Sequence, residues 1–385
     1  MKITGITVWI VPLTSHETYY MAGGKTCDTV DTVVVRIDTD SALVGWGEVC
    51  PIPHYLAAYA NGVIPAIAEM VPVLIGSNPI GPEALMYKLD RHLIGHNYAK
   101  SAIDTALWDL TAKAANLPLY ALLGGKQTDE IPLYHSITCI NPHEMARMAK
   151  DAFDGGMRQF QAKLGADNDW QADVARLNLI REAVGDGPLV YGDWNNMGTQ
   201  LDCTRTARAV SHLDVMLEAP CPTLAECAAV RSASGLSMKM DELAYDIGSL
   251  LQAHQLGIMD AVALKLSKFG GLSAMRRARD LCMHLGARMC IEDTWGSDIT
   301  TAAVLHLAAS TTPRNLLNTC DLSGYVAPRL DPTAPTRTNG HIAPPNGVGL
   351  GLTPNTDTLG QGAAHFDRGQ HAENTNTRRL DHACK

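Results

Sequence analysis

The sequence predicts an α/β protein whose larger part is a modified (β/α)8-type, TIM-like barrel with an N-terminal α+β capping domain. Short apolar runs recur every 23 to 30 residues between residues 132 and 319, and there are eight of them. Each interval has room for one helix and two loops, which is the repeat of a parallel barrel. Strand-like alternation over residues 1 to 50, followed by helical periodicity, predicts the separate cap.

Composition limits the possible functions. The chain has 385 residues, 46% of them hydrophobic, and a formal net charge of -9 without a Lys/Arg run. These values predict a globular protein with a large core and exclude nucleic acid and anionic membranes as partners. With no apolar run near 20 residues and no signal-peptide pattern, we expect a cytoplasmic protein. The ten cysteines lack a CxxC pair, which favours buried free thiols over zinc or disulfides.

The cap is expected to span residues 1-126. The runs "ITGITVWIVPL" and "DTVVVRIDTDSALVGWGEV" have the residues of strands, and "SHETYYMAGGKT" and "CPIPHY" are predicted to interrupt them as loops. Helical periodicity begins near residue 60 and continues through "AIDTALWDLTAKAANLPLYALLGG". Gly124 and Gly125 are the predicted stop of this helical region.

The barrel is expected over residues 127-324. Its eight predicted strands end near Ile137, Lys163, Asp193, Glu218, Asp241, Lys265, Glu292 and Thr319. An open doubly wound sheet is the alternative that spacing alone leaves open. The segment 325-385 is rich in Gly and Pro and then polar, so we expect it to pack back on the cap, with a frayed tail after about residue 365.

Five consecutive predicted strands end in a charged residue. These are Lys163, Asp193, Glu218, Asp241 and Lys265. In a parallel barrel the carboxyl ends of all strands meet on one face, so these residues become neighbours. Three adjacent carboxylates repel one another unless a cation neutralises them, and oxygen-only ligands suit Mg²⁺ better than zinc or copper. The alternative for each acid is a helix N-cap or a surface charge.

The two lysines lie on the strands before and after the three acids, so we expect them to face each other across the barrel mouth. Near Mg²⁺ and a second lysine, the pKa of a lysine should fall enough for the neutral amine to act as a base. Mg²⁺ bound to a substrate carboxylate would stabilise the dianion left when the α-proton departs. Two bases on opposite faces permit inversion at the α-carbon or elimination. Ordinary salt bridges are the alternative role of these lysines.

Several stretches resemble the enolase superfamily, in its muconate-lactonizing-enzyme-like branch. They are "GHNYAKSAIDTALWDLTAKAANLPLYALLGG", "YGDWNN", "LEAP", "MDE", "ALKLSKFGG" and "GVGLGLTP", so the resemblance covers nearly the whole chain. It implies one Mg²⁺ per subunit held by Asp193, Glu218 and Asp241, with Lys163 and Lys265 as the acid/base pair. Asn195 and Lys268 match positions whose side chains contact the metal ligands and hold them in place. Homo-oligomers are also implied by the resemblance.

Within this branch the chain looks most like the hydroxyproline-handling enzymes, first the cis-3-hydroxy-L-proline dehydratases and second the 4-hydroxyproline betaine 2-epimerases. "LVGWGEVCPIPHY", "LIGHNYAKSAID" and "EDTWGSDIT" carry this likeness. One departure is Gln161, where many members have the first lysine of a KxK pair. The betaine enzymes present a tryptophan at the eighth strand, whereas this chain has "NTCDLSGY", which favours a secondary amine. The candidate substrate-binding residues are Tyr20, Tyr55, Asp293 and Asp321.

The resemblance implies dehydration of cis-3-hydroxy-L-proline to Δ1-pyrroline-2-carboxylate. The α-hydrogen and the hydroxyl of this substrate lie on opposite ring faces, so water must leave in an anti elimination. We expect Lys163 to take the α-proton and Lys265 to protonate the departing hydroxide, with C2 epimerisation as a side activity. The alternatives are a racemase or 2-epimerase of prolines or their betaines, and a non-catalytic, metal-stabilised binding subunit.

Overall fold

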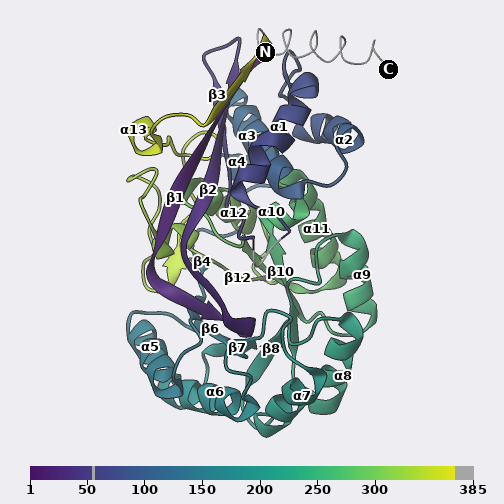
Figure 1. The fold of residues 1–385 in the computed structure, drawn as a ribbon, viewed down its shortest axis with the longest axis vertical. Helices are drawn as coiled ribbons and strands as arrows, with labels where there is room; N and C mark the ends of the chain where they lie inside the picture. The colour runs from purple at the N-terminus through teal and green to yellow at the C-terminus, as the bar shows by residue number, and fades with distance from the viewer. Residues whose placement is uncertain (54–56, 369–385) are drawn as a thin grey trace, which may run out of the picture.

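The computed structural model describes residues 1–53 and 57–368. An antiparallel sheet at the N-terminus consists of β1 (Ile3–Met21), β2 (Lys25–Thr39) and β3 (Val44–Val49). The first two strands form a long hairpin that turns in the 3-10 segment η1 (Ala22–Gly24). In Figure 1 this hairpin is the purple ribbon that runs from the cap to the end of the barrel near β6 and β7. The cap therefore contributes its hairpin tip to the barrel mouth.

The prediction of a loop over "SHETYYMAGGKT" is wrong, because β1 continues through most of this segment. Tyr19 pairs with Cys27 and Tyr20 with Thr26 across the hairpin, after a register shift that begins at Thr14. The polar residues before the tyrosines hide the alternation in the sequence, whereas cross-strand pairing keeps the backbone extended. The turn itself is limited to η1.

The cap helices cover one side of this sheet. They are α1 (Ala60–Leu74), α2 (Pro82–His92), α3 (Asn97–Ala114) and the short α4 (Leu119–Leu122), which agrees with the predicted helical start near residue 60. Ile6, Val35, Ile67 and Ile103 belong to the core that the sheet and helices share. A Cβ atom on Gly47 would overlap the backbone of α3, so only glycine permits this close approach.

Eight parallel strands form the barrel, which confirms the predicted fold class. They are β5 (His135–Ile137), β6 (Gln159–Lys163), β7 (Leu189–Asp193), β8 (Val215–Glu218), β9 (Met238–Met240), β10 (Ala261–Lys265), β11 (Arg288–Glu292) and β12 (Leu316–Thr319). Neighbours in space are neighbours in sequence, which excludes the doubly wound order. A parallel bridge between Leu133 and Thr319 joins the two ends of the sheet.

Helices connect the barrel strands and form the outer row in Figure 1. They are α5 (Pro142–Asp154), α6 (Trp170–Val184), α7 (Gln200–Ala209), α8 (Leu224–Ser234), α9 (Ile247–Gln255), α10 (Leu266–Phe269), α11 (Leu272–Leu285) and α12 (Asp298–Ala309). Five of them begin with a polar side chain that accepts a hydrogen bond from a first-turn N–H, namely Asn141, Asp169, Thr199, Thr223 and Asp246. These caps place the helix starts just after the loops at the barrel mouth.

A buried carboxylate joins the cap to the barrel. Glu48 on β3 accepts hydrogen bonds from Thr32 Oγ1 and from the backbone N–H groups of Ser297 and Thr300, at 2.7–2.8 Å. The last two donors belong to the start of α12, where a negative charge is favourable. Glu48 therefore fixes the entry of the chain into α12, and with it the loop that follows β11.

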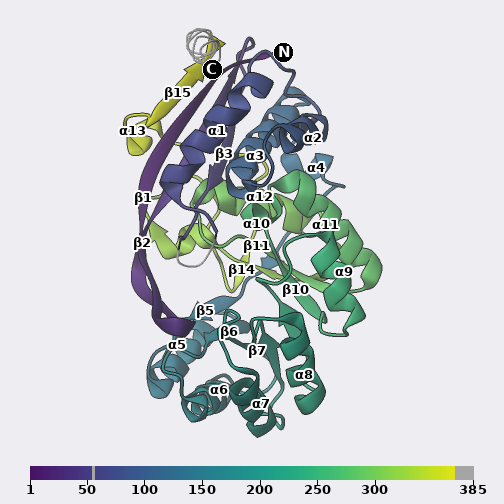
Figure 2. The ribbon, with the colours of Figure 1, turned by 45° about the vertical axis from the view of Figure 1, so that its right-hand side comes forward.

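The C-terminal segment returns to the cap. It contains β13 (Val326–Ala327), β14 (His341–Ile342), α13 (Thr356–Leu359) and β15 (Ala364–Asp367), with the 3-10 segment η2 (Leu322–Tyr325) before it. Strands β13 and β15 pair with β1, and Figure 2 shows β15 beside it; β14 pairs with β4 (Ile131–Pro132). Leu350 of the "GVGLGLTP" motif donates its N–H to Asp109 on α3 and accepts from His306 on α12. Most of the tail expected to fray lies outside the described residues.

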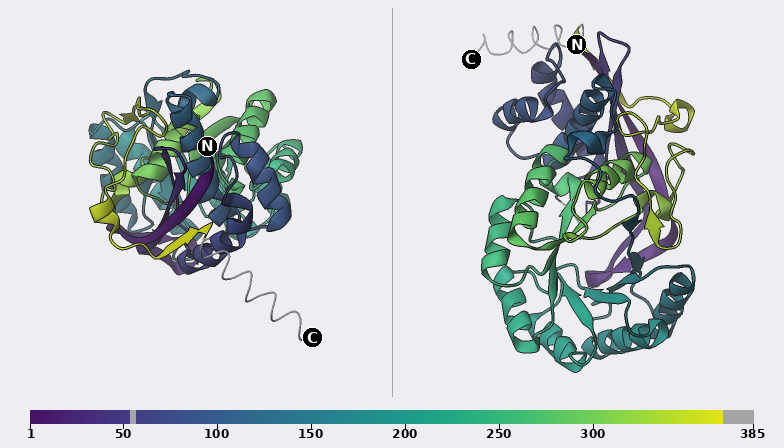
Figure 3. Two further views of the ribbon diagram at one scale, coloured as in Figure 1. Left: turned by 90° about the horizontal axis from the view of Figure 1, so that it is seen from above. Right: turned by 180° about the vertical axis from the view of Figure 1, so that it is seen from behind.

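Two sequence expectations concern the whole molecule. Nine cysteines are free and buried, as predicted, and Cys384 lies outside the described residues. Among the residues that the structure describes, no helix is long and apolar enough to cross a membrane. Seen from behind, the cap helices lie above the barrel, and the purple β1–β2 hairpin runs down beside it (Figure 3).

Candidate active site

The five charged residues singled out in the sequence lie together at the carboxyl ends of neighbouring strands. Lys163, Asp193, Glu218 and Lys265 are the last residues of β6, β7, β8 and β10, and Asp241 directly follows β9. Lys163 pairs in register with Asp193, which pairs with Glu218. All five side chains are at most 8% exposed. The barrel thus concentrates three carboxylates and two ammonium groups, all largely buried, at one end of the sheet.

Each lysine of the pair contacts one of the acids. Lys163 Nζ lies 2.5 Å from Asp193 Oδ2, and Lys265 Nζ lies 2.6 Å from Asp241 Oδ2. Burial would lower the pKa of Lys163, but the charges of Asp193 and Glu218 outweigh it and raise that pKa. The lowered pKa that the sequence argument expected for a lysine beside bound Mg²⁺ stays a prediction, because the raised pKa reflects the effect of the carboxylates alone.

The carboxylates influence one another as well. Burial, and after it the charges of Glu218 and Asp241, raise the pKa of Asp193 to about 6 in spite of Lys163. Burial and the charge of Asp241 also raise the pKa of Glu218 against the effect of Lys239. Asp241 differs, because Lys265 and Lys268 overcome its burial and lower its pKa. Further positive charge would therefore stabilise the ionised forms of Asp193 and Glu218.

Glu218 is held from two sides by residues inside the barrel. Gln161 donates from Nε2 to Glu218 Oε2 at 2.7 Å and to Asp193 Oδ2 at 3.1 Å. Lys239, on β9 and fully buried, places Nζ 2.8 Å from Glu218 Oε1. Where many relatives have the first lysine of a KxK pair, this chain thus has the neutral amide of Gln161. The cation that contacts Glu218 is Lys239, which comes from another strand.

Asn195 and Lys268, which the resemblance expects to support the ligands, contact two of the acids. Asn195 donates from its backbone N and from Nδ2 to the two oxygens of Asp193, at 2.8 and 2.9 Å. Lys268 donates to the backbone oxygen of Asp241 at 2.6 Å and to Asp241 Oδ1 at 3.0 Å. Both side chains fix carboxylates that point toward the barrel mouth.

The donor set fits a hard divalent cation, and Lys163, Lys239 and Lys265 contact its three acids. Among the described residues, no three acid, imidazole or thiol side chains are already arranged as a metal site. The three acids nevertheless supply only oxygen and are buried at adjacent strand ends, and the charge of Asp241 raises the pKa of both Asp193 and Glu218. Such a set suits Mg²⁺, which is bound by one or more carboxylates together with water and substrate oxygens.

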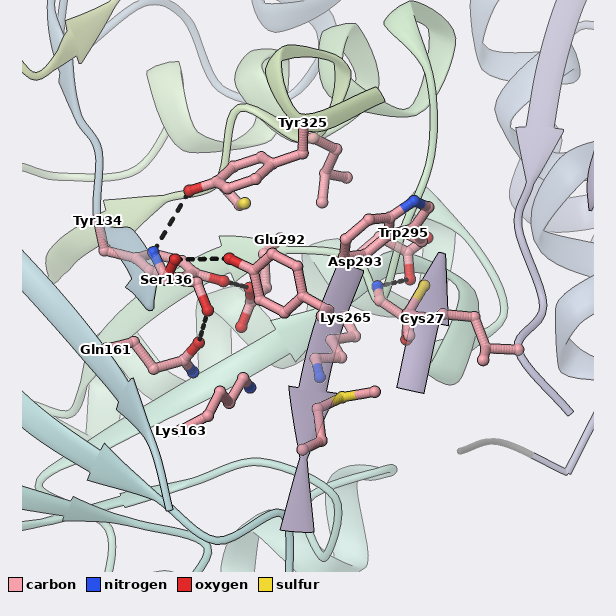
Figure 4. A pocket seen from close by; sticks show the side chains of 16 residues that line it. Cys27, Tyr134, Ser136, Gln161, Lys163, Lys265, Glu292, Asp293, Trp295 and Tyr325 are labelled. Carbon is pink, nitrogen blue, oxygen red and sulfur yellow. Dashed lines mark hydrogen bonds between the residues drawn. The ribbon is translucent and has the colours of Figure 1, made fainter. Parts of the chain in front are cut away.

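A cavity that is partly open to solvent reaches Gln161, which contacts two of these acids. Both Lys163 and Lys265 line it, and in Figure 4 their nitrogen atoms point toward one another across it. The charge of Lys265 also acts on Lys163. The arrangement can therefore present two amines to opposite sides of one small molecule.

Aromatic side chains form another wall of this cavity. Tyr19 from β1, Trp295 from the loop after β11, and Tyr325 from η2 contact one another, with ring centroids 5.6–6.4 Å apart. The sequence argument searched for a tryptophan only at the eighth strand. The structure places Trp295 in the cavity from the preceding βα loop, so the absence of tryptophan from "NTCDLSGY" does not exclude an aromatic contact with the substrate.

The candidate substrate-binding residues are placed differently from one another. Asp293 lines the cavity. Tyr20 is 44% exposed and does not line it, because side chains alternate along β1 and its neighbour Tyr19 takes the inward position. Asp321 does not line it either and pairs with Arg337 at 2.8 Å. Tyr55 lies outside the described residues.

Sequence reasoning missed several polar and aromatic residues of the site. Glu292 ends β11 and lines the cavity, and Tyr134 donates a hydrogen bond of 2.5 Å to it. Glu292 occupied the same strand-end position as the five residues that were chosen, so its signal was present. Lys239 also had a signal, because it precedes Asp241 by two positions and shares its face of the strand. Tyr134 precedes the first strand and had none.

Comparisons with known proteins agree with this architecture. The mandelate racemase / muconate lactonizing enzyme N-terminal domain family matches residues 4–124, and the enolase C-terminal domain-like family matches residues 144–358. Cis-3-hydroxy-L-proline dehydratase from Roseibium aggregatum is 38% identical, over 95% of this chain and 100% of the relative. N-succinyl-L-Arg/Lys racemase from Bacillus cereus is 27% identical, over 84% of this chain and 88% of the relative.

A solved structure extends the likeness to three dimensions. A member of the enolase superfamily from Roseovarius nubinhibens, complexed with magnesium, superimposes with a TM-score of 0.90 at 33% identity. The match covers 95% of this chain and 100% of that one. Family models that span both the cap and the barrel, together with these full-length relatives, establish that the chain is an enzyme of the enolase superfamily.

Proposed function

We propose that the chain catalyses Mg²⁺-dependent dehydration of cis-3-hydroxy-L-proline to Δ1-pyrroline-2-carboxylate, as a hydro-lyase with one Mg²⁺ per subunit. The observation that carries the proposal is the placement of Lys163 and Lys265 on one cavity beside three buried carboxylates. A dehydratase of this substrate is 38% identical over the whole relative, which supports the same choice.

Asp193, Glu218 and Asp241 would hold the metal. When bound, Mg²⁺ supplies the positive charge that stabilises a substrate carboxylate as negative charge develops on it. Asn195, Gln161 and Lys268 keep the three acids in position through the hydrogen bonds described above. The chain itself supplies the proton transfers.

Lys163 in its neutral form takes the proton from the α-carbon of the substrate. The electron pair of that C–H bond becomes the new C=C bond as the bond between the ring carbon and the hydroxyl breaks. Lys265 in its protonated form gives a proton to the departing hydroxide, which leaves as water. The resulting enamine then tautomerises to the cyclic imine Δ1-pyrroline-2-carboxylate.

The stereochemistry of this substrate demands groups on both sides. In cis-3-hydroxy-L-proline the α-hydrogen and the hydroxyl lie on opposite ring faces, so a single side chain cannot reach both. Lys163 from β6 and Lys265 from β10 approach the cavity from different strands, with three strand ends between them. This separation supports an anti elimination with a base on one face and an acid on the other.

Epimerisation at C2 is the second candidate function. If Lys163 removes the α-proton while the C–O bond stays intact, protonation of the α-carbon by Lys265 from the opposite face would invert it without loss of the hydroxyl. The wall of Tyr19, Trp295 and Tyr325 supports this candidate for N-methylated prolines, because aromatic faces attract quaternary ammonium groups. Racemases and epimerases among the relatives, at 27–30% identity, point in the same direction.

A non-catalytic binding subunit is the third candidate. Such a subunit would not need Lys163 and Lys265 in the cavity, whereas both lysines line it. A Lys163→Ala variant indistinguishable from the parent in every assay would favour it.

The test is incubation of the protein and Mg²⁺ in heavy water with 3- and 4-hydroxyprolines, prolines and their betaines, followed by NMR of the α-hydrogen. Formation of the pyrroline from cis-3-hydroxy-L-proline supports the proposal. If a member of the panel exchanges its α-hydrogen for deuterium and no member undergoes elimination, the epimerase replaces the dehydratase as the proposed function.

A further inference from the structure

The proposed substrate carries a positive charge next to its reacting carbon. A proline-type amine is protonated near neutral pH, and its nitrogen is bonded directly to the α-carbon from which the proton is removed. The cavity already contains two lysines, so the ammonium group needs a carboxylate partner to balance the local charge. The inference below rests on the proposed function and identifies that partner.

Two of the acids considered from the sequence have their oxygens engaged. Asp321 accepts hydrogen bonds from Arg337 Nε at 2.8 Å, from the backbone N of Gly324 at 3.1 Å and from Ser323 Oγ at 3.2 Å, outside the cavity lining. Asp293 lines the cavity, but Ser267 and Thr294 donate three hydrogen bonds to its two oxygens, at 2.5–3.1 Å. Asp293 therefore orders the loop after β11 and has little capacity left.

Glu292 is arranged differently. Its Oε2 accepts the hydrogen bond from Tyr134, which fixes the carboxylate plane. Its Oε1 receives no hydrogen bond from the residues that the structure describes, and its nearest cation, Lys239 Nζ, lies at 3.9 Å, beyond hydrogen-bond distance. Lys239 is bound more closely to Glu218, at 2.8 Å. One oxygen of Glu292 thus keeps its lone pairs for a ligand.

The position of Glu292 also suits the substrate. It ends β11, and its Cα pairs in register with that of Lys265 on β10. Paired residues of adjacent parallel strands lie about 5 Å apart and point to the same side of the sheet. Both side chains line the cavity, and Figure 4 shows them beside one another. The ring nitrogen of a substrate that binds between Lys163 and Lys265 can therefore reach Glu292.

We propose that Glu292 is the residue that binds the amine of the substrate, with a substrate N–H donating to Oε1 while Tyr134 holds Oε2. The site takes a cyclic secondary ammonium whose carboxylate is directed at the three metal-ligating acids. Asp293 has the supporting role of ordering the neighbouring loop, and Asp321 has no contact with the substrate.

The experiment compares two ligands that differ at one atom. L-proline has the ring N–H₂⁺ group, and (S)-tetrahydrofuran-2-carboxylate has a ring oxygen in its place. Their binding to the Mg²⁺-loaded protein is measured by calorimetry, which does not depend on turnover. We expect the parent to prefer L-proline by roughly 10- to 100-fold, the range of a hydrogen bond between charged groups.

The decisive variant is Glu292→Gln, which keeps an acceptor for Tyr134 and removes the charge. We expect the preference for L-proline to fall below about 3-fold while the affinity for the oxygen analogue and for Mg²⁺ stays within about 3-fold. Asp321→Asn is the matched control and should keep the full preference. Glu292→Asp retains the charge and should keep part of the preference, which separates charge loss from misfolding.

A full preference for L-proline in Glu292→Gln, or its loss in Asp293→Asn but not in Glu292→Gln, would overturn the inference. In either case the parent would still convert cis-3-hydroxy-L-proline, and the proposed function would stand. If the parent neither converts that compound nor distinguishes the two ligands, the proposed function itself fails and the inference fails with it.

Discussion

Replacing Lys239 by methionine removes a positive charge from the barrel interior and leaves an unbranched side chain that is one heavy atom shorter. The ammonium group is fully buried, 2.8 Å from Glu218 Oε1 and 3.9 Å from Glu292 Oε1. It also lies over the rings of Tyr134 and Tyr191, at 5.3 and 4.7 Å from their centroids. In the variant, two buried carboxylates would face each other without this cation.

The expected cost follows from this geometry. Breaking a buried ion pair by removing one partner costs about 3–5 kcal/mol, because the remaining charge loses its compensation. The unfolding entropy of a 385-residue chain is about 0.8 kcal/mol per degree. We therefore expect the metal-free Lys239→Met variant to unfold about 4–6 °C below the parent.

Calorimetric melting in the presence of a chelator, and again with Mg²⁺, is the assay. Mg²⁺ should recover part of the loss, because a cation at Glu218 replaces some of the missing charge, and its stabilising shift should be larger than in the parent. The double variant Lys239→Met/Glu218→Gln removes both charges and should lose less stability than the single variant. Equal melting temperatures of Lys239→Met and the parent without metal would refute the electrostatic account.

Three further predictions concern the base and two buried titrating groups. Lys163→Met should slow α-hydrogen exchange by about 10²- to 10⁴-fold with Mg²⁺ binding retained, as NMR in heavy water and calorimetry would show; exchange at the parental rate would exclude Lys163 as the base. Burial lowers the pKa of His306 to about 4, so the folded state binds fewer protons and stability is lost as pH falls from about 6.5 toward 4, by at most about 3 kcal/mol. Urea titrations over that pH range should show that the free energy of unfolding of His306→Gln changes less with pH than that of the parent. An unchanged pH dependence would contradict the assignment. Burial raises the pKa of Asp104 to about 7, so here the folded state binds the extra proton and stability is lost as pH rises from about 4 to 7, by at most about 4 kcal/mol. The same titrations on Asp104→Asn should remove this decline, and its persistence would show that another group causes it.

Much of the architecture could be predicted because local chemistry marks it. An apolar run that ends in a charged residue identifies the carboxyl end of a barrel strand, and every predicted strand end lies within one residue of the observed one. The parallel order then determines which residues become neighbours, so Asp193, Glu218 and Asp241 could be grouped before any coordinates existed. Only the outer part of the β1–β2 hairpin, over "SHETYYMAGGKT", escaped prediction, because its extended backbone depends on pairing between strands rather than on alternation within one.

The side chains that line the cavity could not be predicted in the same way, because contacts between distant parts of the chain decide which of them face it. Tyr19 and not Tyr20 faces the cavity, because the hairpin register selects one side of β1. Trp295 reaches the cavity from a loop whose entry into α12 is held by Glu48, 249 residues before Ser297. The sequence alone determined the fold, the acids and the two lysines, since these follow from strand periodicity and parallel order. Only tertiary packing decided which side chains surround the substrate, because their directions are set by neighbours remote in the chain.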